Sequence, residues 1–207
     1  MQRINLQPGY VLHQRPYRDS SVIIDVLTPE FGRMSLLGKG VKRAKSRFQG
    51  QLRAFQPMLV SWCGRGELMT LTQVEIPGKH LQMDGSCLSS GFYLNELLMR
   101  LAHKFEPQVE IFNDYDTAVR GLSALSGSSG RNQQLLQAIL RIFEIKLLRN
   151  LGYEVLLDTE AETNTAVQAE VEYQYHLDHG PVRINNSADN INDHTAKDEC
   201  ELILMRF

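Results

Sequence analysis

Short runs of apolar and β-branched residues, separated by glycine and proline, make up the first part of the chain, to about residue 79. Runs bounded by such turn residues are typical of β-strands. Five of them in under 80 residues favour a small closed barrel over an open sheet, because closure removes edges that would pair with other chains. The runs lie at Tyr10–Arg15, Val22–Thr28, Met34–Lys39, Pro57–Cys63 and Glu67–Ile76, with turns at Phe31-Gly32-Arg33 and Gly64-Arg65-Gly66.

The middle of the chain changes to the spacing of amphipathic helices. Three helices are predicted, at Leu88–Lys104, Val109–Leu125 and Gln133–Leu151, with the second having the weakest pattern. Gly152 stands where a helix C-terminal cap belongs. The apolar stripe of the first helix is predicted to be Tyr93, Leu94, Leu97, Leu98 and Leu101, and that of the third Leu135, Leu136, Ile139, Ile142, Phe143 and Leu151.

These patterns predict an α+β protein in three parts. Residues 1–79 form a small five-stranded closed barrel, and residues 80–157 form an α-helical domain. Residues 158–207 are an acidic C-terminal region of uncertain fold. In it Val171–Tyr175 and Val182–Ile184 resemble short strands and Asn185–Asn192 resembles an exposed loop.

Charge is distributed unevenly along a chain whose formal net charge is only −2. The segment from Phe31 to Gly66 holds eight basic residues and no acidic one, whereas Glu154–Glu201 holds twelve acidic residues and two basic ones. Such asymmetry indicates an anionic partner for the basic segment. The eight basic residues are Arg33, Lys39, Lys42, Arg43, Lys45, Arg47, Arg53 and Arg65.

The sharpest local feature is the ten-residue stretch Gly38–Arg47, which has five cations spaced by small residues. Side chains in such a loop can follow the phosphates of a nucleic acid, and binding would then depend strongly on salt because condensed counterions are released. We therefore predict DNA contacts at Arg33, Lys39, Lys42, Arg43, Lys45, Arg47 and Arg65. A solvated basic loop without a ligand is the alternative.

Aromatic residues in the barrel segment could stack on bases. Most of them, among them Tyr10, Phe31, Phe55 and Trp62, are expected in the core, because a barrel of this size needs their bulk. The stacking candidates are Phe48 and Tyr17, because each stands beside basic residues.

Catalytic and metal-binding patterns are weak. The glycine pairs match neither a Walker loop nor a dinucleotide fingerprint, and the carboxylates and six histidines are scattered. Cys63, Cys87 and Cys200 lie far apart, which indicates reduced thiols rather than disulfides or a zinc site. The sequence therefore predicts a protein that is not an enzyme, holds no cofactor or metal, and remains in the cytoplasm, since no apolar segment is long enough for a signal peptide or a membrane span.

The third predicted helix offers a second binding surface. Arg141 and Arg149 lie within about 80° of each other around the helix, with Lys146 further round. Next to exposed leucines, these cations would hold an acidic peptide with an apolar tip. The alternative is an ordinary charged outer face.

Several motifs occur in an order that resembles the RecO family of bacterial DNA repair proteins. The resemblance covers roughly residues 10–155 and is carried by VLHQRPYRDSS (Val11–Ser21), DVLTPEFGR (Asp25–Arg33), Lys39-Gly40, LRAFQP (Leu52–Pro57), GRGEL (Gly64–Leu68), Thr70-Leu71, YLNELL (Tyr93–Leu98) and Leu151-Gly152-Tyr153.

The resemblance implies an oligonucleotide-binding (OB) barrel followed by a helical domain, in a nucleoid-associated mediator of recombinational repair. Such proteins bind single- and double-stranded DNA, anneal complementary strands, and act with RecR to load RecA onto strands coated by the single-stranded-DNA-binding protein SSB. They hold the acidic C-terminal tail of SSB through the helical domain, where Arg141 matches by position. The alternative is an adaptor that mainly binds SSB or RecR. Some members carry a four-cysteine zinc site after the Leu-Gly-Tyr motif, but Leu156–Thr163 has no cysteine, so no zinc is expected.

Overall fold

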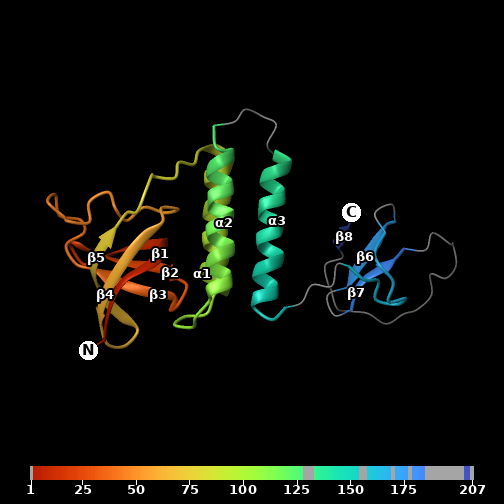
Figure 1. Ribbon diagram of the computed structural model, residues 1–207, viewed down its shortest axis with the longest axis horizontal. Coiled ribbons are helices and arrows are strands. Elements are labelled where there is room, and N and C mark those ends of the chain that lie inside the picture. Colours follow the sequence, from red (N-terminus) through yellow and green to blue (C-terminus); the bar gives the residue numbers. More distant parts are fainter. Residues whose placement is uncertain are drawn as a thin grey trace. The chain divides into compact units, whose positions relative to one another are not determined.

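The computed structural model describes residues 2–127, 133–153, 158–168, 171–176, 179–184 and 203–205. The chain divides into two compact units, Met1–Gly152 and Tyr153–Phe207. The first unit contains a barrel followed by three helices (Figure 1), which confirms the predicted α+β architecture with an OB-type barrel.

The barrel has five strands, in the order β1-β2-β3-β5-β4, and closes between β4 and β1. Its β3 and β5 are parallel, and the other neighbours are antiparallel. All five predicted strands are present, although the first is much longer than expected. The strands are β1 (Gln2–Tyr17), β2 (Ser21–Thr28), β3 (Gly32–Gly38), β4 (Met58–Gly64) and β5 (Leu68–Glu75).

Alternate residues of these strands fill the barrel. Ile24 and Val26 of β2 point inward and pack with Leu36, Val60 and Trp62 in one buried cluster. Leu27, the residue after Val26, faces the opposite side of the sheet and belongs to a second cluster shared with the helices. Strand β2 is buried along nearly its whole length because both of its faces are covered.

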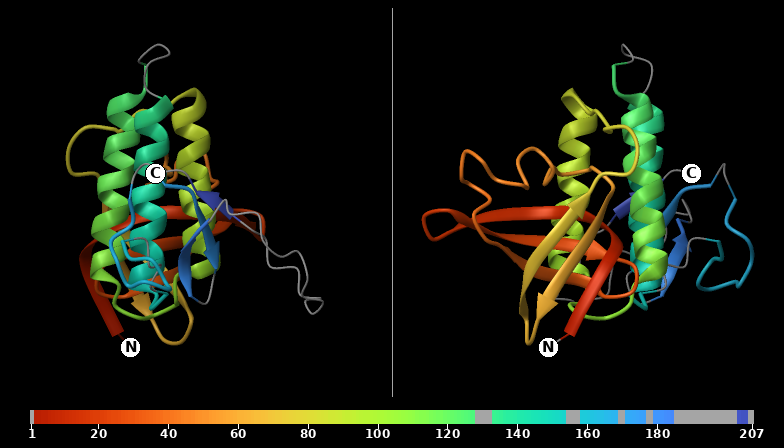
Figure 2. Two further views of the ribbon diagram at one scale, coloured as in Figure 1. Left: turned by 90° about the vertical axis from the view of Figure 1, so that its right-hand side faces the viewer. Right: turned by 60° about the vertical axis from the view of Figure 1, so that its left-hand side comes forward.

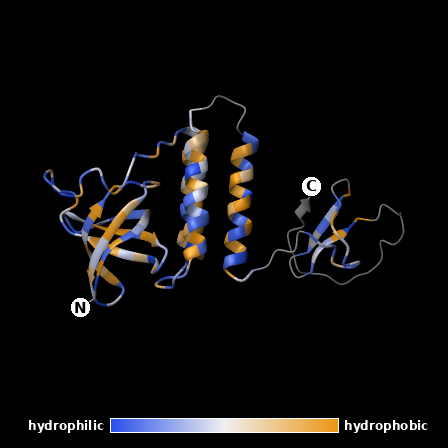
Figure 3. Cartoon of the chain, in the orientation of Figure 1, coloured by the Kyte–Doolittle hydropathy of each residue, from blue (hydrophilic) through white to orange (hydrophobic). Residues whose placement is uncertain are grey.

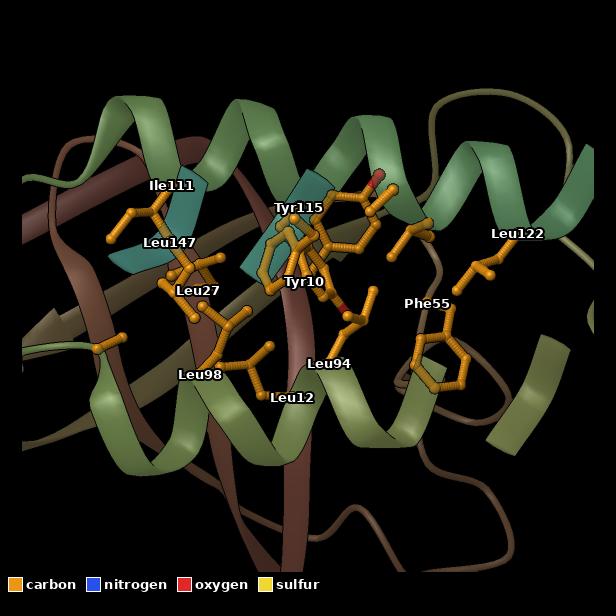
Figure 4. Close-up of a cluster of buried hydrophobic side chains, with 14 of the residues drawn as sticks. Tyr10, Leu12, Leu27, Phe55, Leu94, Leu98, Ile111, Tyr115, Leu122 and Leu147 are labelled. Atoms are coloured by element: carbon orange, nitrogen blue, oxygen red, sulfur yellow. The ribbon is translucent and has the colours of Figure 1, made fainter. Parts of the chain in front are cut away.

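The three helices are α1 (Gly85–Leu101), α2 (Val109–Leu125) and α3 (Gln133–Asn150), close to the predicted ranges. The second core cluster joins them to the outer face of the barrel, and Figure 4 shows Tyr10, Leu12 and Leu27 of the barrel among Leu94, Leu98 and Tyr115 of the helices. Gly152 has φ +87° and its N–H donates to the carbonyl of Arg149, which confirms the predicted helix cap.

The apolar stripes of α1 and α3 were predicted wrongly in part. Tyr93 and Leu101 of α1 are exposed, because this helix turns Leu94, Leu98 and the polar Asn95 toward its neighbours instead. Leu135 and Ile142 of α3 are also exposed, each more than half. Of the helix α3, only Phe143 and Leu147 are buried, and apolar residues alternate with polar ones along its length (Figure 3).

A β-bulge ties the barrel to the helices. The pairing of β1 with β2 shifts register between Val11 and His13, so Leu12 is the extra residue whose carbonyl is available to another partner. Asn95 of α1 donates its side-chain amide to that carbonyl at 2.8 Å. The hydroxyl of Tyr115 on α2 in turn donates to the Asn95 side-chain oxygen at 2.5 Å. One buried amide therefore connects β1, α1 and α2.

Two further contacts reinforce this junction. The Tyr10 hydroxyl of β1 donates to Asp116 of α2, whose other oxygen accepts from Arg120 at 2.7 Å. Burial, and then the Asp116 carboxylate, raise the pKa of the Tyr10 phenol far above its ordinary value. At Gly32, which has φ +59°, an added Cβ would lie 2.0 Å from the carbonyl oxygen of Glu106, so only glycine allows the β2–β3 turn to approach the α1–α2 loop this closely.

The second unit contains a three-stranded sheet in the order β7-β6-β8. Its strands are β6 (Tyr173–His176), β7 (Gly180–Arg183) and β8 (Ile203–Met205), and the first two lie near the predicted short strands. Beside them the buried Glu160 accepts hydrogen bonds from the hydroxyls of Thr163 and Tyr173. The loop predicted at Asn185–Asn192 lies outside the described residues.

Candidate nucleic-acid interface

The basic loop that joins β3 to β4 is held in a defined conformation. Successive turns are closed by backbone hydrogen bonds, including Arg43 N–H to the Gly40 carbonyl and Ser46 N–H to the Arg43 carbonyl. Phe48 and Leu52 anchor the loop by inserting into the barrel core. The loop therefore presents its cations from a fixed backbone at one end of the barrel.

The five cations of this loop all point into solvent. Lys39, Lys42, Arg43, Lys45 and Arg47 are exposed, and in the described part of the chain none of them forms an ion pair. Cations held close together without counter-charges produce a strong local positive potential. This is the electrostatic footprint expected of a surface that binds a polyanion.

The β1–β2 hairpin extends the basic surface, which sequence reasoning missed. The Lys42 N–H donates to the Ser20 carbonyl at 3.0 Å, and the Gln14 side-chain amide donates to the Leu52 carbonyl at 2.5 Å. These bonds fix the loop against the hairpin, and the two segments lie at the same end of the barrel (Figure 2, right). Arg15 and Arg18 of the hairpin are exposed. We call the combined set the cationic surface: Arg15, Arg18, Lys39, Lys42, Arg43, Lys45, Arg47 and Arg53.

Two of the predicted DNA contacts lie elsewhere. Arg33 stands at the start of β3, and its Nε donates to the Ala102 carbonyl at 3.1 Å. Arg65 is exposed in the β4–β5 turn. Strand β5 runs parallel to β3 and begins with Leu68 opposite Ser35, so this turn lies toward the same end of β3 as Arg33. The loop starts at the other end of that strand, roughly 20 Å along it.

The aromatic residues fall mainly in the core, as expected. Tyr10, Phe55 and Trp62 are buried. The stacking prediction for Phe48 was wrong, because only 3% of this residue is exposed and its ring lies within the barrel cluster, with Arg47 above it at 4.7 Å. Tyr17 is partly exposed on the hairpin, with the Arg18 guanidinium 5.3 Å from its ring.

The buried Asp25 has a structural explanation. It accepts a hydrogen bond from the Ser35 hydroxyl at 2.5 Å, and its second oxygen lies 3.7 Å from Nδ1 of His13 on β1. In this set the carboxylate stands between serine and histidine, so the histidine cannot take the serine proton as it would in a nucleophilic triad. Among the described residues, no three His, Cys, Asp or Glu side chains gather as a metal site would require.

The three predicted cations of α3 lie on different sides of the helix. Lys146 is paired with Asp114 of α2 at 2.7 Å and lines an open, mainly apolar groove formed with Thr117, Ala118, Ile139, Ile142 and Phe143. Arg149 is exposed one turn further on. Arg141 is turned away from the groove and pairs with Glu144, which also accepts the Tyr93 hydroxyl at 2.7 Å. Burial, and then that bond to Glu144, raise the pKa of Tyr93.

Comparison with known proteins identifies the family. The family model for the recombination protein O N-terminal region matches residues 1–78, and the model for its C-terminal region matches residues 82–194. The chain belongs to the RecO family. Proteins named DNA repair protein RecO are 43% identical over 182 residues in Nitrosococcus oceani and 40% identical over 187 residues in Nitrosospira multiformis.

These relatives cover most of the chain. The alignments span 88% and 90% of this chain and 71% and 74% of the respective relatives. This RecO-family chain is therefore a DNA repair protein, and its barrel and its helices correspond to the two regions that define the family. None of its described helices is long and apolar enough to cross a membrane.

The position of Phe48 leads to a prediction about stability. Phe48→Ala should lower the free energy of unfolding by about 3–5 kcal/mol, because a large side chain would leave a cavity in the barrel core. Tyr17→Ala, on the hairpin, should change it by less than about 0.5 kcal/mol. Urea unfolding of the two variants measures both values. Equal, small effects would mean that Phe48 does not anchor the loop.

Proposed function

We propose that this protein is a recombination mediator that binds DNA, anneals complementary strands, and acts with RecR to load RecA onto SSB-coated single strands. The observation that carries the proposal is the cationic surface, whose loop side chains are exposed without ion pairs among the described residues. Such a surface attracts the phosphates of a nucleic acid regardless of its base sequence. Membership of a family of DNA repair proteins supports DNA as the polyanion.

Annealing follows from the same electrostatics. Two complementary strands repel each other through their phosphates, and a surface with eight neighbouring cations lowers that repulsion when both strands contact it. Contacts to the phosphates leave the base edges free to pair. We therefore propose a non-catalytic role in which DNA is brought together rather than cleaved.

We assign the parts of the chain as follows. Residues 1–79 are the DNA-binding domain, residues 80–157 are the helical domain that binds partner proteins, and residues 158–207 are an acidic region that contributes no DNA contact. Its charge supports this assignment, because carboxylates repel phosphates. The protein acts in the bacterial cytoplasm at the nucleoid, where its DNA substrate is found.

The DNA-binding surface can be tested through its salt dependence. Changing Lys42, Arg43, Lys45 and Arg47 together to Ala should weaken binding to single and double strands, and should reduce the slope of log affinity against log salt by roughly 3. Fluorescence anisotropy across a salt series measures the slope.

Arg65→Ala is the matched control, since this exposed arginine lies outside the cationic surface, and it should leave the slope nearly unchanged. A quadruple variant with the slope of the unaltered protein would refute the proposed surface. Labelled strands incubated with Mg²⁺ or Mn²⁺ in the same experiment should stay intact.

We further propose that the α2–α3 groove holds the C-terminal tail of SSB. Ile139 and Phe143 line the groove and Ile142 is more than half exposed, so an apolar residue of a peptide would find partners there. Lys146 stands in the groove wall, where its ion pair with Asp114 would have to open before it met the acidic residues of the tail. The exposed Arg149 lies beyond it. Arg141 lies further round the helix, and its bond to Glu144 would have to open before it joined in.

The groove gives a second prediction. Lys146→Glu and Ile142→Glu should each weaken binding of an SSB-tail peptide by at least about tenfold, since they add negative charge where the acidic tail lies. DNA affinity should stay the same. Arg141→Glu should also weaken binding of the peptide, because in the unaltered protein Arg141 would leave Glu144 to contact the tail. Isothermal titration with the peptide measures these effects, and Arg100→Glu on α1 serves as a control.

The alternative function, an adaptor that mainly binds SSB or RecR, makes a different prediction from the same variants. An adaptor would lose its effect on RecA loading in the Lys146→Glu variant but keep it in the quadruple loop variant. A mediator, as proposed here, would lose its effect on RecA loading in both the Lys146→Glu variant and the quadruple loop variant.

A further inference from the structure

An open pocket lies where the basic loop ends and α1 begins, outside both surfaces described above. It is open to solvent, and about 1150 Å³ of space lies between its walls and its mouth. Three segments far apart in the sequence build it: the end of the basic loop at Ala54 and Phe55, the connection from His80 to Asp84 with Leu88 of α1, and the end of α2 at Ser123, Ser126 and Gly127.

One wall of the pocket is apolar and partly aromatic. It includes Phe55, Met83 and Leu88. Helix α1 approaches this wall closely at Gly91, where an added Cβ would lie 2.9 Å from the Phe55 ring and 3.3 Å from the Met83 sulfur. Phe92 is more than half exposed and packs edge-on against Phe55 at 5.0 Å. Only 4% of Phe55 is exposed, so it supports the wall from behind, and a flat ring would pack on the accessible side chains of Met83 and Leu88.

Two polar groups of the pocket, His80 and Asp84, present hydrogen-bond acceptors. Oε1 of the buried Gln56 accepts from the Leu81 N–H at 3.3 Å and lies 2.8 Å from Nδ1 of His80. A carbonyl oxygen can only accept, so Nδ1 of His80 carries the hydrogen of the neutral ring, and Nε2 is left as an acceptor.

Asp84 supplies the second acceptor. Its Oδ1 accepts from the Ser126 hydroxyl at 2.6 Å and from the Gly127 N–H at 3.3 Å. Its Oδ2 has no hydrogen-bond partner among the described residues, and no Lys or Arg lines the pocket. A carboxylate without a neighbouring cation repels phosphates and acidic peptides and favours ligands that carry N–H donors.

The pocket continues directly from the cationic surface. Arg53, an exposed member of that surface, immediately precedes Ala54 of the pocket wall. The Leu52 carbonyl is fixed by Gln14 of the hairpin at 2.5 Å, so this part of the loop has a defined position. A strand whose phosphates follow the loop would therefore bring its bases to the mouth of the pocket.

We propose that this pocket receives one unpaired nucleobase that carries an amino group, namely adenine, cytosine or guanine. The inference rests on the proposed DNA-binding function, because the cationic surface must hold the backbone of the same strand. The cationic surface binds the phosphates of single strands and of duplexes alike, whereas the pocket accepts only a base that is not stacked within a duplex. The pocket thus gives the protein a means to prefer single strands. It would also favour oligo-dC, whose base has an exocyclic amino group, over oligo-dT, whose N–H lies between two carbonyl oxygens that the acceptors repel.

Leu88→Glu tests the pocket by placing a second carboxylate in its wall. This residue is exposed, so the fold should tolerate the change. Affinity for oligo-dC should fall about five- to tenfold, as expected when the stacking of one base is lost, while affinity for duplex DNA stays the same. Leu101→Glu, an equally exposed leucine of α1 outside the pocket, is the matched control. Fluorescence anisotropy with oligo-dC, oligo-dT and duplex measures all affinities.

Asp84→Asn tests the chemistry of the pocket. The asparagine oxygen can still accept from the Ser126 hydroxyl. Its NH2 group then stands where Oδ2 of Asp84 stood, so a hydrogen-bond donor replaces the free acceptor. Affinity for oligo-dC should fall and affinity for oligo-dT, whose base has two carbonyl groups, should rise, so the preference reverses. An unchanged ratio of the two affinities would overturn the assignment of the base class.

The quadruple loop variant, measured in parallel, separates the two proposals. If that variant loses affinity for every DNA while Leu88→Glu behaves like Leu101→Glu, the pocket takes no base and only this inference fails. If the loop variant binds all three DNAs normally, the cationic surface and the pocket are both refuted.

Discussion

The arrangement of this protein depends on one buried side-chain amide. Asn95 hydrogen-bonds the Leu12 carbonyl at the bulge of β1 and accepts the hydroxyl of Tyr115. Without the asparagine, a buried carbonyl and a buried hydroxyl would both lose their partner, at a cost of about 1–3 kcal/mol each. The same contact determines which face of α1 meets the barrel, and therefore where the rest of the helical surface points.

The two surfaces to which we assign binding are positioned by this junction. The cationic surface occupies the end of the barrel where the β1–β2 hairpin and the basic loop are bonded to each other. The groove that we assign to the SSB tail lies between α2 and α3. Because barrel and helices form one compact unit, the separation of the two surfaces is fixed. If both surfaces act as we propose, the protein would hold DNA and the protein that coats it at the same time.

The sequence predicted the strands, the helices and the basic loop, because each leaves a local pattern. Alternation and turn residues located the strands, and the missing acidic residues located the loop. The contribution of Arg15 and Arg18 could not be foreseen, since it depends on a contact between Lys42 and Ser20 that links separate strands. Charge alone also grouped Arg33 and Arg65 with the loop, although the register of β3 and β5 places them toward the other end.

Burial was harder to predict than secondary structure. Phe48 stands beside Arg47 in the sequence and looked like a surface residue, yet the loop turns its ring into the barrel. Conversely, Tyr93 and Ile142 fit apolar stripes but are exposed, because α1 and α3 have neighbours on fewer sides than a periodic pattern assumes. The pocket beside Phe55 left no signal in the sequence, since it is assembled from three distant segments.

The most direct test of this account is whether barrel and helices unfold together. Trp62 is the only tryptophan of the chain and lies fully buried in the barrel, so its fluorescence reports the barrel alone. Far-ultraviolet circular dichroism reports mainly the helices. If the Asn95 junction makes one body, urea unfolding followed by the two signals gives a single coincident transition, and Asn95→Leu shifts both midpoints down by the same amount. Two separate transitions, or a shift in only one of them, would contradict the account.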